Sequence, residues 1–245
     1  MSALARVAGR RSVTLLGGVR VPSYLAMLYA GCLCGAVAGA GVAHAEGLDA
    51  PRFALTATLL LVPALAGARL WFVLLHPELF RGAQARIWNR AEGGSSVYGG
   101  LIAGIAASVP VLAIAGLPFW SFWDAASVMM LVGLIFTRLG CLMNGCCGGR
   151  ATNGPLGVTL PDHRGDWLRR YPTQLLEAAF AGIVLAAALA LRASAGPGEV
   201  FAGVVASYAA LRLALEPTRE PEHRARGNVA VSVALLAAAV ALLAT

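Results

Sequence analysis

The sequence contains no lysine: all 19 of its basic residues are arginines, and 12 acidic residues oppose them. Charged residues make up only 13% of the chain, against roughly 25% in soluble domains. Apolar segments separate the arginines, so they form no continuous basic stripe of the kind that nucleic-acid binding requires. The composition therefore excludes an ordinary soluble domain and argues against nucleic-acid binding. Arginines between apolar segments instead suit anionic lipid headgroups.

Cysteine is scarce, and its five occurrences are an odd number, which argues against a disulfide scaffold. Cys141, Cys146 and Cys147 follow a C-x4-C-C spacing with no C-x2-C or histidine pair beside them. This spacing differs from that of known zinc sites, so we predict no metal. Three alternatives remain for these thiols: small side chains beside a glycine-rich turn, a disulfide from Cys141 to Cys146 or Cys147, or a covalent enzyme thiol.

The N-terminal region lacks the pattern of a cleaved signal peptide. Arg10 and Arg11 form a twin-arginine pair, but no A-x-A-like cleavage site follows a short apolar core. The first apolar segment is therefore expected to remain as a membrane anchor.

Apolar residues are abundant: they make up 58% of the chain, and the mean hydropathy is +0.73. Because a helix needs about 20 apolar residues to cross a membrane, we predict an all-α integral membrane protein with seven transmembrane helices. Residues 1–23 are expected to form an N-terminal arm, and residues 24–245 a single transmembrane domain with a polar loop at about 144–173. The candidate spans are Tyr24–Val42, Phe53–Leu75, Val97–Leu117, Phe122–Met143, Leu175–Leu191, Val200–Leu215 and Val229–Ala244.

Small residues recur within the first span. Gly31, Gly35 and Gly39 lie four residues apart, and small residues at this spacing let helix backbones approach closely. We expect these glycines to serve helix packing.

Arg69, Arg138 and Arg212 lie within apolar spans or at their ends. A charge inside a membrane is costly, so such residues normally face a polar cavity and serve a function. The alternative is that the long side chain extends to the nearer interface. We expect the spans to surround a polar, arginine-lined cavity that binds lipid.

A polar helix face lies near the end of the sixth span. Tyr208, Arg212, Glu216 and Arg219 fall within an arc of about 80° on an ideal helix. Guanidinium groups match phosphate oxygens, so this face is predicted to bind an anion such as a lipid phosphate; a structural ion pair is the alternative. Pro217 predicts that the helix kinks or ends there.

Residues 170–177 open the fifth span. Pro172 is well placed to begin a helix, and Thr173 to cap it. Gln174 and Glu177 are three residues apart and share a helix face, where they are available to a headgroup or to an arginine.

Five motifs, in this order, carry a resemblance over residues 24–222. They are SYLAMLYAG, AGARLWFVLLH, SSVYGGLIAG, TRLGCLMNGCCGGR continuing to RYPTQLLEA, and YAALRLALEPTREPE. Their order and spacing resemble those of the phosphatidylglycerol–prolipoprotein diacylglyceryl transferases, seven-span enzymes of the bacterial inner (plasma) membrane. The resemblance implies transfer of a diacylglyceryl group from phosphatidylglycerol to the lipobox cysteine of a prolipoprotein, with release of glycerol phosphate. It implies no metal and no cofactor, and its partners are these two substrates and membrane lipids.

The resemblance also implies site residues. Arg138 and Arg212 would hold the phosphate and stabilise the leaving group, while Glu216 would orient Arg212 or accept a proton. Tyr98 would donate a hydrogen bond. The residues expected to bind substrate are Tyr24, Arg69, Gly99, Gly100, Asn144, Gly145, Gly149, Arg150, Gln174, Glu177, Tyr208 and Arg219.

The chain departs from the family pattern at four positions. Tyr98 stands where many members have a histidine that has been considered a base, and Tyr171 replaces the histidine before a proline. Cys141 replaces an asparagine, and Cys146 an acidic residue. These changes put a histidine-dependent mechanism in doubt. They favour, as an alternative, a catalytically altered paralogue that binds or transports lipid; a redox membrane protein is a third hypothesis, which rests on the cysteines alone.

The predicted membrane orientation contains a conflict. Nearly all loop arginines lie on the N-terminal side of the seven spans, which the positive-inside rule assigns to the cytoplasm. The resemblance implies the reverse, with the N-terminus toward the periplasm. We follow the resemblance because several of these arginines belong to its site motifs.

Overall fold

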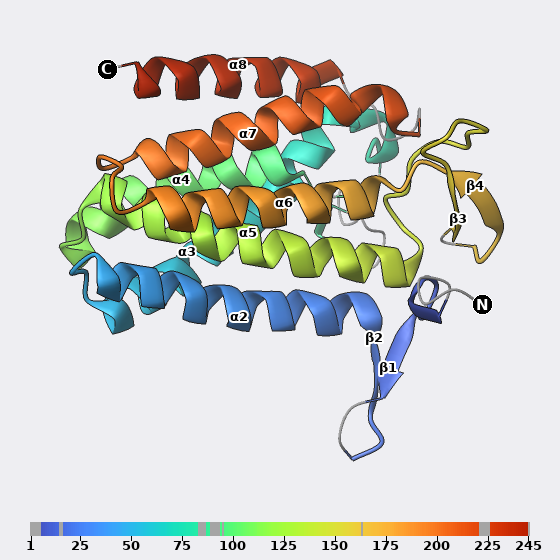
Figure 1. Cartoon of the computed structure of the whole chain (residues 1–245), viewed down its shortest axis with the longest axis horizontal. Coiled ribbons are helices and arrows are strands. Elements are labelled where there is room, and N and C mark those ends of the chain that lie inside the picture. Colours follow the sequence, from blue (N-terminus) through green and yellow to red (C-terminus); the bar gives the residue numbers. More distant parts are fainter. Residues whose placement is uncertain are drawn as a thin grey trace.

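The computed structural model describes residues 6–14, 17–82, 87–88, 94, 96–162, 164–220 and 226–244. Within these residues the main body is a bundle of seven long helices (Figure 1). They are α2 (Ser23–Ala45), α3 (Ala50–Leu75), α4 (Val97–Ala115), α5 (Phe119–Asn144), α6 (Thr173–Leu191), α7 (Glu199–Leu215) and α8 (Arg226–Leu243). Two 3-10 turns, η1 (Pro77–Leu79) and η4 (Glu216–Thr218), follow α3 and α7.

Six of these helices, α2 to α7, are long and apolar enough to cross a membrane. The apolar helix within α8, Gly227–Leu243, is shorter. The prediction of an all-α, multi-pass membrane protein is confirmed, and each predicted span overlaps one of the observed helices.

Two short antiparallel strand pairs were not predicted. β1 (Ser12–Thr14) pairs with β2 (Arg20–Pro22) in the N-terminal arm, and β3 (Val158–Pro161) pairs with β4 (Trp167–Arg170) in the polar loop. Both pairs lie at the end of the bundle where the chain begins, and the C-terminus lies at the other end (Figure 1). The arm is packed against this end, because Ala8, Leu142 and Leu160 form a small buried cluster.

Local chemistry explains several helix ends. The Asp49 carboxylate accepts a hydrogen bond from the backbone N–H of Arg52 at 2.8 Å and caps α3. Helix α7 ends at Leu215, two residues before Pro217, as predicted. Thr173, by contrast, makes no capping bond at the start of α6, where Pro172 is the N-cap residue. The prediction that Thr173 caps this helix is wrong, because its hydroxyl donates instead to the carbonyl oxygen of Cys147 at 2.7 Å.

Glycines bring two pairs of helices into close contact. Gly31, Gly35 and Gly39 of α2 are buried, and a Cβ at Gly35 would lie 2.7 Å from the carbonyl oxygen of Met129 in α5. The predicted packing role is confirmed. Likewise, a Cβ at Gly99 of α4 would lie 2.4 Å from the carbonyl oxygen of Gly67 in α3. These contacts place α5 and α4 where they can form the walls of the site described next.

Candidate functional site

A cavity of about 550 Å³ lies among α3, α4, α5, α7 and α8. Most of its wall is apolar, with residues that include Leu60, Leu101, Phe122, Trp123, Met129, Leu131 and Val204. Its polar lining comes from the helix ends nearest the two strand pairs: Tyr24, His76, Ser96, Tyr98, Thr137, Arg138, Cys141, Cys147, Tyr208, Arg212, Arg219 and Asn228. The cavity is therefore amphipathic along its length, as a site for a lipid with a polar head must be.

Glu177 lies beside the polar end and binds two arginines. One carboxylate oxygen is 2.6 Å from Nη2 of Arg138, and the other accepts a hydrogen bond from Nη2 of Arg219 at 2.9 Å. Glu177 is only 2% exposed, and a buried carboxylate is tolerated when it is paired in this way. Glu177 thus contacts arginines rather than lining the cavity, and it holds two cavity-lining guanidiniums in place.

Arg212 and Glu216 form a second ion pair, with Nη1 and Oε2 2.8 Å apart. Because α7 ends at Leu215, Arg219 lies beyond the helix, and the single helical face predicted for these residues does not exist. Tyr208, Arg212 and Arg219 nevertheless meet at the same cavity. After α7 the chain forms the turn η4, and Arg219 beyond this turn donates a hydrogen bond to Glu177.

Several polar atoms at this end have unmet hydrogen-bonding capacity. Nε of Arg138, Oε1 of Gln174 and Oδ1 of Asn228 are buried without a hydrogen-bond partner among the described residues. Buried polar groups are nearly always hydrogen-bonded in folded proteins. Arg138 and Asn228 line the cavity, so a ligand with phosphate and hydroxyl oxygens would satisfy both a donor and an acceptor there.

Tyr98 is buried in the cavity wall and its hydroxyl is hydrogen-bonded to the hydroxyl of Ser232 in α8. Ser232 donates its own proton to the carbonyl oxygen of Asn228 at 2.8 Å. Tyr98 must therefore be the donor to Ser232. Its ring lies edge-on to that of Tyr208, with centroids 6.3 Å apart, so Tyr98 joins α4 to α7 and α8.

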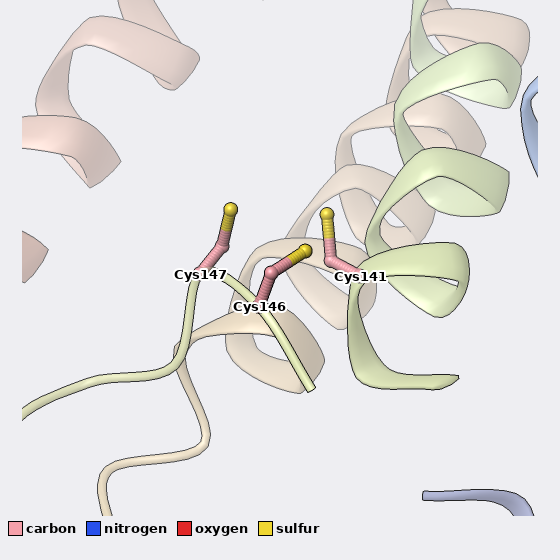
Figure 2. A group of neighbouring side chains, drawn as sticks. All are labelled: Cys141, Cys146 and Cys147. Atoms are coloured by element: carbon pink, nitrogen blue, oxygen red, sulfur yellow. The ribbon is translucent and has the colours of Figure 1, made fainter. Parts of the chain in front are cut away.

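The Gly-Cys-Cys segment after α5 is a tight turn held by α6. Gly145 and Cys147 have φ angles of 74° and 59°, in the left-handed region that disfavours most side chains. Nε2 of Gln174 donates to the carbonyl oxygen of Cys146 at 2.7 Å, and Thr173 binds that of Cys147. The Cys146 thiol points toward Cys141, and the Cys147 thiol lies on the other side of Cys146 (Figure 2).

The Cys147 thiol has a distinctive electrostatic environment. Hydrogen bonds with the thiols of Cys141 and Cys146, and the guanidinium charges of Arg138 and Arg219, hold the pKa of the Cys147 thiol well below its usual range. All five cysteines are free thiols.

Other predicted site residues do not line this cavity. Buried Arg69 donates from Nε to the carbonyl oxygen of Ile87 at 2.6 Å and from Nη1 to that of Gly94 at 2.8 Å. It therefore fastens the connection between α3 and α4. Gly99 packs against α3, whereas its neighbour Gly100 lines the cavity.

The glycine-rich stretch after α5 supports the site from outside. Asn144 is the last residue of α5, and a Cβ at Gly145 would lie 2.4 Å from the carbonyl oxygen of Asp162. Gly149 donates its N–H to the carbonyl oxygen of Tyr171 at 2.9 Å. Arg150 is exposed and its guanidinium lies over the Tyr171 ring.

His76 lines the cavity and was not among the predicted site residues. Its Nδ1 lies 3.0 Å from the carbonyl oxygen of Phe72, so Nδ1 carries the hydrogen and Nε2 is left as an acceptor. The signal was present in the sequence, since His76 ends the AGARLWFVLLH motif. A histidine at the end of an apolar span is equally consistent with a residue at the membrane interface. The position of His76 in the sequence therefore does not by itself indicate a site residue.

Comparison with known proteins gives consistent matches. A family model described as prolipoprotein diacylglyceryl transferase matches residues 11–245. Phosphatidylglycerol–prolipoprotein diacylglyceryl transferases of Rhizobium leguminosarum bv. trifolii and Sinorhizobium medicae are 34% and 37% identical over 165 and 167 residues. Each alignment covers 64% of this chain and 57% of the relative. One from Rhodopirellula baltica is 35% identical over 153 residues, 59% of this chain and 30% of the relative.

Proposed function

Because the chain belongs to the prolipoprotein diacylglyceryl transferase family, we propose that it transfers the diacylglyceryl group of phosphatidylglycerol to the lipobox cysteine of prolipoproteins. Its location would be the bacterial inner membrane, and membrane lipids would surround it. The observation that carries this proposal is the amphipathic cavity, whose polar end presents Arg138. The buried Nε of Arg138 has no hydrogen-bond partner within the described part of the chain. A phosphate beside that nitrogen would leave the acyl chains to the apolar wall.

The reaction is a substitution at carbon. The lipobox sulfur attacks the terminal glyceryl carbon of the diacylglyceryl unit; a carbon–sulfur bond forms as the carbon–oxygen bond to phosphate breaks. Glycerol phosphate leaves with the electron pair of that bond, and the thiol proton passes to a base. Negative charge therefore grows on the departing phosphate in the transition state.

Arg138 and Arg212 stabilise this developing charge. Both line the cavity and both are held by carboxylates, at 2.6 Å to Glu177 and 2.8 Å to Glu216. Preorganised donors in a water-poor site act without costly rearrangement during the reaction. Glu177 and Glu216 are thus positioning residues, and Glu216 serves Arg212 rather than acting as the base.

His76 is the residue best suited to take the thiol proton. Histidine is the most frequent general base in enzymes, and Nε2 of His76 is left as an acceptor because Nδ1 donates to the carbonyl oxygen of Phe72. Tyr98 already donates to Ser232. Tyr98 therefore shapes the cavity. His76, the residue that follows α3, would supply the base in place of a histidine at position 98.

The test is lipidation in cells depleted of their own transferase. A prolipoprotein with a lipobox should gain the mass of a diacylglyceryl group when this chain is expressed, and much less of it should do so with Arg138→Ala. If the wild-type chain is inserted and folded but adds no mass, the transferase proposal fails. Binding of phosphatidylglycerol without transfer would instead support the altered paralogue.

A further inference from the structure

The three cysteines near the polar end form a compact cluster. The sulfur atoms of Cys141, Cys146 and Cys147 all lie within 4.8 Å of one another. Cys141 comes from the last turns of α5, and the other two come from the turn that follows (Figure 2). Cys141 and Cys147 also line the cavity.

The backbone of the turn is what brings the sulfurs together. The reversal at Gly145 carries the chain back toward α5, and Cys147 adopts a left-handed conformation that is unfavourable for a residue with a side chain. Thr173 and Gln174 hold the carbonyl groups of Cys147 and Cys146 in this arrangement. The sequence spacing argued against a metal because it matches no regular zinc motif, but the reversal produces the convergence that such motifs normally supply.

The geometry fits a zinc ion. Zinc–sulfur bonds of about 2.3 Å at tetrahedral angles require sulfur–sulfur separations of about 3.8 Å. Small side-chain rotations would contract the observed cluster to that size. A disulfide would use only two of the converging sulfurs and leave the third without a role.

The charges around the cluster are also suitable. Three thiolates and one zinc ion carry a single net negative charge. The guanidiniums of Arg138 and Arg219, which line the same cavity as Cys141 and Cys147, would offset that charge. Thiolate-rich sites select soft ions such as zinc over magnesium or calcium. Three protein ligands leave a fourth position open, as in catalytic zinc sites.

We propose that Cys141, Cys146 and Cys147 bind one zinc ion, with the fourth coordination position directed toward the cavity. The ligand suited to that position is another thiolate. If the proposed transferase function holds, this thiolate is that of the lipobox cysteine. The lipobox thiol gives its proton to a base, and the resulting thiolate binds the ion. The sulfur leaves the ion as a thioether once its carbon–sulfur bond has formed.

The first experiment measures metal in the whole protein, purified in lipid nanodiscs without substrate. We expect one zinc per chain by elemental analysis, and loss of that zinc in the single variants Cys141→Ser, Cys146→Ser and Cys147→Ser. The matched control is the double variant Cys32→Ser/Cys34→Ser, which changes two cysteines of α2 outside the cluster and should retain the ion. Size-exclusion and thermal unfolding establish that each variant is folded.

Cobalt substitution provides a second readout that does not depend on activity. Cobalt should give a thiolate-to-metal absorption band that each cluster variant weakens, and a lipobox peptide should strengthen the band by adding a sulfur ligand. Two results would overturn the site: wild-type protein that binds neither zinc nor cobalt, or metal content that the cluster variants leave unchanged. Recovery of two cluster thiols as a disulfide under non-reducing alkylation would also overturn it.

The outcomes separate this site from the proposed function. If the protein binds one zinc per chain but transfers no diacylglyceryl group, the proposed metal site is supported and the proposed transferase function is refuted. If a folded variant with serine at Cys141, Cys146 and Cys147 keeps full transfer activity, the lipobox thiolate does not need zinc. The proposed transferase function would then still hold.

Discussion

The guanidinium of Arg138 lies 2.6 Å from the carboxylate of Glu177. The two residues sit on α5 and α6, which are joined by the long polar loop. The pair joins the two helices at the polar end of the cavity. Among the described residues, Nε of Arg138 has no hydrogen-bond partner, so the arginine is fixed in position yet still able to bind a ligand.

Replacing Arg138 with alanine should lower the transfer rate by about 100- to 1,000-fold, the usual effect of removing a preorganised donor to developing charge. The measurement is the transfer rate to a lipobox peptide in phosphatidylglycerol vesicles. Arg192→Ala is a matched control, since Arg192 follows α6 at the other end of the bundle. Equal losses in the two variants would point to general damage and contradict the assigned role.

Glu177→Gln keeps the shape of the side chain but removes a buried charge that two arginines contact. Breaking such a pair typically costs about 3–5 kcal/mol, so a marked fall in thermal stability is expected together with a lower transfer rate. For comparison, Glu46→Gln removes a carboxylate that is 4.0 Å from Arg192 near the surface, and should cost about 0–1 kcal/mol. Thermal unfolding in nanodiscs measures both variants. Equal unfolding temperatures for Glu177→Gln and Glu46→Gln would show that the buried carboxylate of Glu177 is no more important for stability than that of Glu46.

Gly99→Ala should destabilise the bundle without a specific effect on lipid affinity. The added methyl would meet the carbonyl oxygen of Gly67 at 2.4 Å and Cβ of Trp71 at 2.2 Å, and overpacking of this kind costs about 1–3 kcal/mol. In Gly100→Ala the nearest described atom to the added methyl is the carbonyl oxygen of Ala64, at 3.2 Å, and the methyl projects from the cavity wall. We expect Gly99→Ala to lower the unfolding temperature, and Gly100→Ala to change the KM for phosphatidylglycerol.

His76→Gln should reduce the transfer rate by about 100-fold or more, the usual contribution of a general base. The measurement is the transfer rate to a lipobox peptide in phosphatidylglycerol vesicles. Tyr98→Phe is the control in the same cavity wall, and it should keep most of the rate because the Tyr98 hydroxyl donates to Ser232. A rate in His76→Gln equal to that of the wild type would show that another group is the base.

Reporter fusions at the two termini test the membrane topology. The seven predicted crossings would put the termini on opposite sides, and the N-terminus is expected in the periplasm with the polar end of the cavity. A periplasm-active reporter should therefore work at the N-terminus and fail at the C-terminus. The opposite pattern would favour the positive-inside rule and would place the polar end of the cavity in the cytoplasm.

The apolar runs were sufficient to predict the helices, because burial in a membrane depends on composition over a whole segment. The contacts between segments were not predictable in the same way. Asp124 in α5, for example, accepts hydrogen bonds from the backbone N–H groups of Gly198 and Phe201 and so caps α7. Nothing local to Asp124 signals a partner more than 70 residues away.

The site shows the same division. Arg138 and Arg212 were recognisable because a charge in an apolar run needs a reason. The role of Thr173 was misread, since a threonine before a helix usually caps it and here bonds to Cys147. The three cysteines converge because Gly145 and Cys147 adopt the left-handed backbone conformation. The sequence spacing of the cysteines does not reveal these backbone conformations.

The polar loop between α5 and α6 is closed at its base. Thr173 and Gln174 bond to the carbonyl groups of Cys147 and Cys146, and Gly149 bonds to Tyr171. A loop whose ends are already joined pays little further entropy for extra length. Beyond this clamp, Arg164 and Gly165 are exposed in the connection between β3 and β4. A purification tag inserted there should therefore leave the thiols in place.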